Sequence, residues 1–262
     1  MELTVDGIRI HAATGSRDAE PGEPVVVLVH GSGMDRTVWQ MQTRYLAHKG
    51  RRVLALDLPG HGRSEGEAIA DVPAMADWLV RFLDAAEVET ACVAGHSMGS
   101  LVAIEMASRH GDRVRSLGLV GTAAAMPVHP DLIAAAEAGD DLAPNLITDW
   151  GFSQGAHMGG HPSPGLWVSR AGFRIIANGR SATLATALKA CNAYDGAAEA
   201  AVRITCPTRM ILGSEDRMTP VKAAQPLIAA MPEAEVIVLP KVGHMLPTEA
   251  PIAVAKALLP LV

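Results

Sequence analysis

The sequence predicts an α/β fold with a mostly parallel central sheet and helices on both of its faces. Two observations support this prediction. Short runs of apolar, largely β-branched residues recur along the chain, and segments of helix length separate them. A strand covered on both faces has such an unbroken apolar run, and strands that alternate with helices form parallel sheets.

The expected elements follow one another along the chain. Residues 3–11 alternate apolar and polar side chains, which predicts an edge strand, and a turn-rich connection follows at 15–23. Apolar runs then predict buried strands at 25–29, 53–56, 91–94, 117–120, 210–212 and 236–239. Helices are predicted at 37–49, 71–86, 100–109, 220–231 and 248–259. Of these, 100–109 is apolar almost all round, as a central helix would be.

The alternation of strands and helices stops between residues 123 and 193. This stretch contains helix-like pieces at 131–138, 143–150 and 181–190, with a loop rich in Gly, Pro and His at 151–165. No clear strand pattern occurs in it. We interpret 123–193 as a helical cap inserted in a core domain that comprises residues 1–122 and 194–262.

The composition excludes several classes of protein. The 262 residues suit one large domain, and 49% hydrophobic with 19% charged residues is typical of a well-buried globular protein. The net charge is −6, and no run of Lys or Arg offers a surface for nucleic acid. The chain shows no signal-peptide pattern and no apolar stretch of membrane-spanning length. Its three cysteines are an odd number and have no metal-ligand spacing. Because no signal peptide is recognised, we expect the protein in the reducing cytoplasm.

The most informative short motif is Gly95-His96-Ser97-Met98-Gly99, which directly follows the apolar run at 91–94. A G-x-S-x-G sequence between a buried strand and a helix holds a serine in a sharp turn with its hydroxyl exposed. A serine hydroxyl is a weak nucleophile unless a base and an oxyanion site lie nearby. The alternative is an ordinary Gly-rich turn in which Ser97 only caps the helix.

Polar residues follow most of the predicted buried strands. Ligands of an open parallel sheet bind beyond the carboxyl ends of its strands, so these residues are expected to gather at one edge of the sheet. They are His30-Gly31-Ser32-Gly33, residues 57–64, Ser97, residues 213–217 and Val242-Gly243-His244-Met245.

With these motifs in this order, the sequence resembles the α/β-hydrolase family over nearly its whole length. The resemblance depends on His30 to Gly33, residues 57–64, the turn at Ser97, and then Asp216 and His244. The order Ser, acid, His distinguishes the family from other serine triads. It implies an α/β-hydrolase fold in the serine esterase and lactonase branch with a small helical cap. It also implies an enzyme that acts on ester bonds.

Each of the three matching residues has a chemical role. Ser97 is expected to be the nucleophile, and His244 the general base, because the pKa of imidazole lies near neutrality. Asp216 is expected to hold the second ring nitrogen and stabilise the imidazolium. Glu215 is expected in solvent, Asp57 is expected to shape its own loop, and residues 121–122, where some relatives carry the acid, contain no carboxylate.

The oxyanion hole is expected to consist of two backbone N–H groups. One belongs to Met98 at the start of the central helix, where the helix dipole also favours negative charge. The resemblance assigns the other to Ser32, with Gly33 as the alternative.

A serine at this turn predicts acyl transfer. Haloalkane dehalogenases and epoxide hydrolases need a carboxylate there, so we expect hydrolysis of carboxylic esters through an acyl-enzyme. Four alternatives stay open: an enol-lactone hydrolase, a C–C hydrolase of the meta-cleavage-product type, a haloperoxidase-like perhydrolase and a slow or non-catalytic ligand receptor. The C–C hydrolases continue the oxyanion loop with Pro-Gly, where this chain has Met34-Asp35.

The substrate pocket is expected under the cap. Methionine adapts to irregular apolar shapes, so we predict that Gly33, Met34, Met126, Trp150 and Met245 contact a small or medium apolar group. The expected partner is a small-molecule ester or lactone, with no nucleic acid and no membrane, and homo-oligomerisation is left open. No cofactor and no metal are expected.

Overall fold

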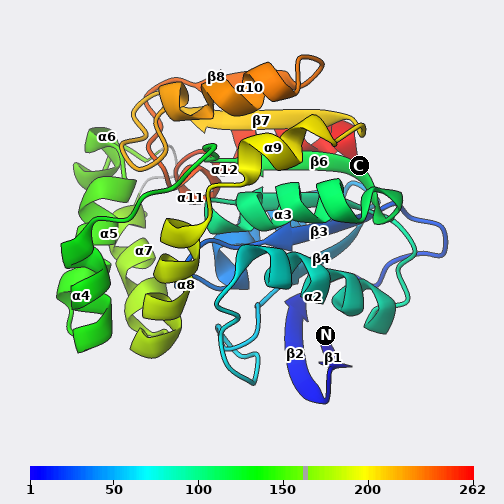
Figure 1. Cartoon of the computed structure of the whole chain (residues 1–262), viewed down its shortest axis with the longest axis horizontal. Helices are drawn as coiled ribbons and strands as arrows, with labels where there is room; N and C mark the ends of the chain where they lie inside the picture. The colour runs from blue at the N-terminus through cyan, green and yellow to red at the C-terminus, as the bar shows by residue number, and fades with distance from the viewer. Residues whose placement is uncertain (162–164) are drawn as a thin grey trace.

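The structure is a computed structural model that describes residues 1–161 and 165–262. In these residues, eight strands form one sheet in the order β1-β2-β4-β3-β5-β6-β7-β8 (Figure 1). The pairs from β4 to β8 are parallel, whereas β1 and β2 pair antiparallel. The strands are β1 (Glu2–Val5), β2 (Ile8–Ala13), β3 (Val25–Val29), β4 (Arg52–Leu56), β5 (Ala91–His96), β6 (Val114–Val120), β7 (Thr208–Gly213) and β8 (Glu235–Leu239).

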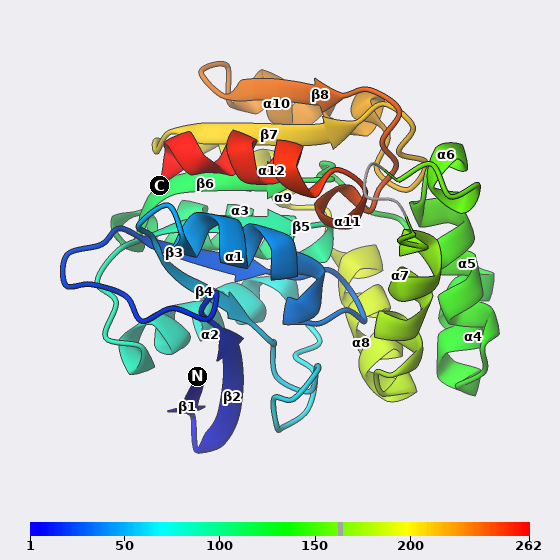
Figure 2. The same ribbon diagram turned by 180° about the vertical axis from the view of Figure 1, so that it is seen from behind.

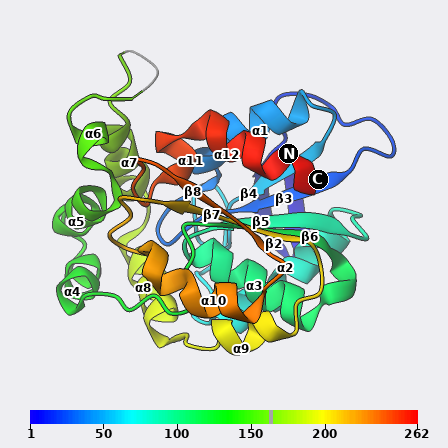
Figure 3. The ribbon, with the colours of Figure 1, turned by 90° about the horizontal axis from the view of Figure 1, so that it is seen from above.

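Helices connect the strands and cover both faces of the sheet. They are α1 (Gln40–Ala47), α2 (Val72–Ala85), α3 (Met98–Arg109), α4 (Pro130–Ala138), α5 (Leu142–Gly151), α6 (Gln154–His157), α7 (Val168–Ala177), α8 (Ser181–Ala193), α9 (Ala197–Val202), α10 (Gln225–Ala230), α11 (Leu246–Glu249) and α12 (Pro251–Leu258). Helices α1, α11 and α12 lie on one face, and α2, α3, α9 and α10 lie on the other (Figures 2 and 3). The predicted mostly parallel α/β fold is confirmed.

The single edge strand predicted at 3–11 is wrong. Asp6 and Gly7 both have positive φ angles, 51° and 81°. Consecutive positive φ angles at an Asp-Gly pair are typical of a tight hairpin turn, so the segment folds back as β1 and β2. Only β2 then pairs with the main sheet, antiparallel to β4.

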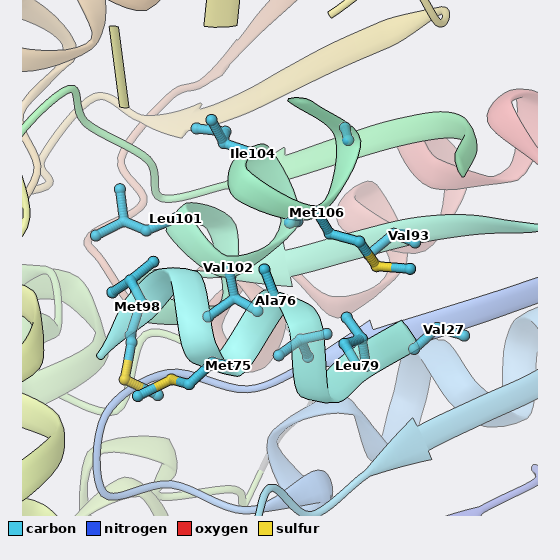
Figure 4. Close-up of a cluster of buried hydrophobic side chains, with 14 of the residues drawn as sticks. Val27, Met75, Ala76, Leu79, Val93, Met98, Leu101, Val102, Ile104 and Met106 are labelled. Carbon is cyan, nitrogen blue, oxygen red and sulfur yellow. The ribbon is translucent and has the colours of Figure 1, made fainter. Parts of the chain in front are cut away.

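Alternate residues of the central strands enter two separate cores. In β3, Val27 and Val29 pack with α2 and α3, whereas Val26 and Leu28 pack on the opposite face. This follows from the two-residue period of a strand. In the first core, Met75 of α2 lies beside side chains of α3 such as Val102 (Figure 4). Because helices cover both faces of the sheet, side chains on both faces of these strands are buried, which explains their unbroken apolar runs.

Between β6 and α9 the chain forms the helices α4 to α8, which lie at the end of the sheet to which β7 and β8 point (Figures 1 and 2). The predicted pieces at 131–138, 143–150 and 181–190 are α4, α5 and α8. Helix α7 was not predicted, and α6 lies within the predicted loop at 151–165, of which 162–164 fall outside the described residues. No helix in the described ranges is long and apolar enough to cross a membrane.

The turn between β5 and α3 brings backbone segments into very close contact. Ser97 has φ 54° and ψ −122°, a strained conformation for a residue with a side chain. A Cβ atom at Gly95 would lie 1.9 Å from the carbonyl oxygen of Gly99. One at Gly99 would lie 2.4 Å from the carbonyl oxygen of Val29. Only glycine fits at these two positions.

We therefore expect Gly99→Ala to destabilise the protein by about 3 kcal/mol, since backbone atoms of β3 would have to move. Alanine has a higher helix propensity than glycine, so a loss of stability in Gly99→Ala would come from the steric contact alone. Urea unfolding measures the change. Gly111→Ala is the matched control, because a Cβ there meets no atom within 4 Å. Equal stability of the two variants would contradict this account of the turn.

Candidate active site

The polar residues that follow the strands converge on one cavity. Its volume is about 390 Å³, and Ser32, Ser97, Thr219 and His244 all contribute to its wall. These residues follow β3, β5, β7 and β8, whose carboxyl ends lie at the same edge of the sheet. The cavity thus lies where ligands of open parallel sheets bind.

The hydroxyl of Ser97 is not used as a helix cap. Ser97 precedes α3, but its side chain makes no capping hydrogen bond. Its backbone holds the turn instead, because Ser97 N donates to the Val120 carbonyl at 3.0 Å and Ser97 O accepts from Ser100 N at 2.8 Å. The half-buried side chain is left on the cavity wall.

His244 is held through its Nδ1 atom, its carbonyl and its backbone N. Its Nδ1 lies 2.9 Å from Asp216 Oδ2, and its carbonyl accepts a hydrogen bond from His96 Nε2 at 2.8 Å. Its backbone N donates to the Gly151 carbonyl at 2.7 Å. The Nε2 atom is buried and has no hydrogen-bond partner among the described residues. With Nδ1 donating to the carboxylate, Nε2 carries the lone pair and is available as a proton acceptor.

Asp216 is buried, and both of its carboxylate oxygens accept hydrogen bonds. Its Oδ1 accepts from Met218 N at 2.9 Å and from Thr219 N at 2.7 Å, and its Oδ2 accepts from the Thr219 hydroxyl at 2.7 Å. Burial by itself would raise the pKa of Asp216. The charge and hydrogen bond of His244, together with the donors of Thr219, outweigh burial and lower that pKa to about 2.

Thr219 is a site residue that the sequence analysis missed. Its hydroxyl bridges Asp216 Oδ2 and His244 Nδ1, at 2.7 and 2.9 Å. A threonine three residues after an aspartate is common in ordinary turns, so the sequence offered only a weak signal.

The loop after β3 lies against the serine turn. A Cβ atom at Gly31 would lie 3.1 Å from Ser97 Cβ. The neighbouring His30 donates from Nδ1 to the Gly31 carbonyl at 2.8 Å and accepts from Leu58 N at 3.1 Å. Burial lowers the pKa of His30 to about 4, so the ring is neutral and can serve as donor and acceptor at once. Ser32 lines the cavity, whereas Met98, the first residue of α3 after Ser97, is fully buried and does not line it.

Four of the five residues predicted to contact substrate line the cavity: Met34, Met126, Trp150 and Met245. The fifth, Gly33, does not. It lines a neighbouring cavity, and a Cβ atom at Gly33 would lie 2.4 Å from Leu184 Cδ1 of α8. The sequence analysis missed the rest of the wall, which consists of Pro127, Val128, His129, Leu132, Ile147, Leu188, Cys191, Arg217 and Met218.

The rival acids and bases have other roles. Asp57 pairs with Arg36 and accepts from the backbone N of Arg36 and Arg63 at 2.6 and 2.9 Å, so it shapes its own loop. Glu215 is exposed. Burial, with a smaller effect of a neighbouring histidine, lowers the pKa values of His61 and His96 to about 3.

Comparison with known proteins gives the family. A model described as the alpha/beta hydrolase family matches residues 26–257. The chain belongs to the alpha/beta hydrolase family. Among its relatives, a pimeloyl-[acyl-carrier protein] methyl ester esterase from Chromobacterium violaceum is 32% identical over 237 residues, which are 84% of this chain and 87% of the relative. A 2-hydroxymuconate semialdehyde hydrolase from Pseudomonas sp. is 38% identical over 47% of this chain and 43% of its own length.

Solved structures of alpha/beta hydrolases share the fold over the whole chain. The enol-lactonase from Burkholderia xenovorans superposes with a TM-score of 0.86 at 24% identity, covering 100% of this chain and 99% of that one. A thermophilic esterase from Thermogutta terrifontis gives a TM-score of 0.81 at 26% identity, with 98% and 96% covered. The family and these relatives support a hydrolase that acts on ester bonds.

The lowered pKa of Asp216 predicts a pH-dependent contribution to stability. A folded-state pKa of about 2 for Asp216, below its ordinary value of 3.8, stabilises the fold above pH 4, and this contribution is lost as the pH falls toward 2. The shift corresponds to about 2 kcal/mol. Urea unfolding of wild type and Asp216→Asn should therefore show a stability difference that shrinks by that amount as the pH falls from 5 toward 2. A difference independent of pH would mean that the pKa is not lowered.

Proposed function

We propose that this protein is a serine hydrolase that cleaves carboxylic esters through an acyl-enzyme, with Ser97, His244 and Asp216 as its catalytic triad. The observation that carries the proposal is the state of His244. Its Nδ1 is engaged by Asp216, and its buried Nε2 is unpaired among the described residues. His244 lines the same cavity as Ser97.

The first half of the reaction forms the acyl-enzyme. Ser97 Oγ attacks the ester carbonyl carbon as His244 Nε2 takes the hydroxyl proton. Asp216, ionised because its pKa is low, stabilises the imidazolium and keeps the ring in place. When the tetrahedral intermediate collapses, the bond to the alkoxy oxygen breaks, and His244 gives its proton to the departing alcohol.

The second half releases the acid. A water molecule attacks the acyl carbon while His244 Nε2 accepts its proton, and the proton returns to Ser97 Oγ as the bond to the enzyme breaks. In both halves the carbonyl oxygen becomes negative. We assign its stabilisation to the backbone N–H groups of Met98, at the amino end of the 12-residue helix α3, and of Ser32.

We assign residues 123–193 as the cap that shapes the substrate pocket. Side chains from this segment, including Met126, Leu132, Ile147 and Leu188, make up much of the apolar wall. Such a wall suits an acyl or alcohol group without charge, and a volume of about 390 Å³ suits a small or medium one.

Ser97→Ala should lower kcat/KM for p-nitrophenyl butyrate at least about 10⁴-fold, because no other group replaces the nucleophile. A fluorophosphonate should label the wild type and not the variant. Activity or labelling that survives in Ser97→Ala would contradict the proposal. A panel of esters, lactones and a vinylogous diketone, run with wild type and variant, distinguishes ester hydrolysis from lactone or C–C hydrolysis.

Met126→Trp should narrow the pocket and reduce activity on p-nitrophenyl hexanoate about tenfold more than on the acetate, since the added ring occupies space that the longer chain needs. Steady-state kinetics with both esters measure the ratio. Met158→Trp is the matched control, because Met158 is 80% exposed and does not line the cavity. The same ratio in both variants would place the acyl chain elsewhere.

A further inference from the structure

The loop that carries His244 is hydrogen-bonded to the junction between α5 and α6. The Gly151 carbonyl, at the end of α5, accepts from His244 N at 2.7 Å and from Met245 N at 3.1 Å. Two consecutive N–H groups of the loop thus share one acceptor on a segment that lies more than 90 residues earlier in the chain. The backbone position of His244 therefore depends on this segment.

A buried carboxylate completes the connection. Glu249 lies in α11 and is 7% exposed. Its Oε1 accepts from Gly243 N at 3.1 Å, and its Oε2 accepts from Ser153 N at 3.1 Å. One oxygen therefore holds the residue before His244, and the other holds the residue before α6. The contact is tight, since a Cβ atom at Gly243 would lie 2.6 Å from Ser153 N and 2.8 Å from Glu249 Oε1.

We propose that Glu249 is a positioning residue, which fixes the His244 loop against the α5–α6 junction so that the imidazole keeps its place relative to Ser97. This inference rests on the proposed hydrolase function. Glu249 does not line the cavity of Ser97, so it acts through the backbone of Gly243 and not on the substrate.

The chemistry of the group fits this role. An ionised carboxylate offers two acceptor oxygens and no donor, which matches two N–H groups that converge from different segments. No Lys or Arg nitrogen of the described residues forms an ion pair with it. Burial raises the pKa of Glu249, while the hydrogen bonds from Ser153 and Gly243 counteract this rise.

Glu249→Gln tests the proposal. Glutamine has the same size but only one acceptor oxygen, so its NH₂ group would face either Gly243 N or Ser153 N. We expect kcat for p-nitrophenyl butyrate to fall about 10- to 100-fold per active site, because small displacements of a base cost that much. KM should stay within about twofold, since the cavity wall is unchanged. Titration with a fluorophosphonate to its end point counts the folded active sites.

Glu105→Gln is the matched control. Glu105 lies in α3, away from the His244 loop, and is also buried, at 6% exposure. It accepts a hydrogen bond from the hydroxyl of Tyr194, which follows α8. It should retain wild-type kcat even if its melting temperature falls. If Glu249→Gln loses thermal stability but retains kcat per active site, Glu249 is only structural and the proposal is wrong.

Hydrogen exchange tests the same connection without any substitution. In the wild type, the amides of Gly243 and Ser153 should both be protected, and in Glu249→Gln at least one should exchange faster. An unprotected amide at either residue in the wild type overturns the proposal, even if the variant fails to fold. A wild type that lacks Ser97-dependent hydrolysis would instead overturn the proposed function, which these exchange rates do not depend on.

Discussion

The alignment of parallel strands at one edge of the sheet is the constraint on which the site depends. Ser97, Asp216 and His244 are widely spaced in sequence, yet each follows a strand whose carboxyl end lies at that edge. The helices on both faces bury the strands and leave only their ends for polar groups. The close approach of Gly99 to β3 then sets where the serine turn begins.

Burial determines the charge state of the groups around the cavity. His30, His61 and His96 are buried, none of them contacts a carboxylate of the described residues by a hydrogen bond, and their pKa values are low. Asp216 is also buried, but its donors keep it ionised. The arrangement therefore provides one stable negative charge beside one imidazole. This is the condition under which His244 can take up a proton and give it back.

Two parts of the chain line the cavity: the loops that follow the strands of the sheet, and the helical segment between β6 and α9. The sheet edge supplies Ser97 and His244, and the segment that contains the helices α4 to α8 supplies most of the apolar wall. These parts also touch through the backbone, because Gly151 and Ser153 bind the His244 loop directly and through Glu249. A change in the position of α5 would accordingly move the backbone of His244 as well as the pocket wall.

The sequence by itself determined the sheet, its covering helices and the residues at the strand ends, because these follow from local apolar periodicity and from the order of short motifs. It missed the hairpin at Asp6 and Gly7, where a turn signal interrupts an apparently continuous strand. Only the tertiary structure decided the hydrogen bonds of Thr219 and Glu249 and the position of Gly33, which lies outside the cavity wall and at which an added Cβ atom would meet Leu184. The physical reason is that these roles arise from contacts between segments far apart in the chain, and no local pattern records which segments will meet.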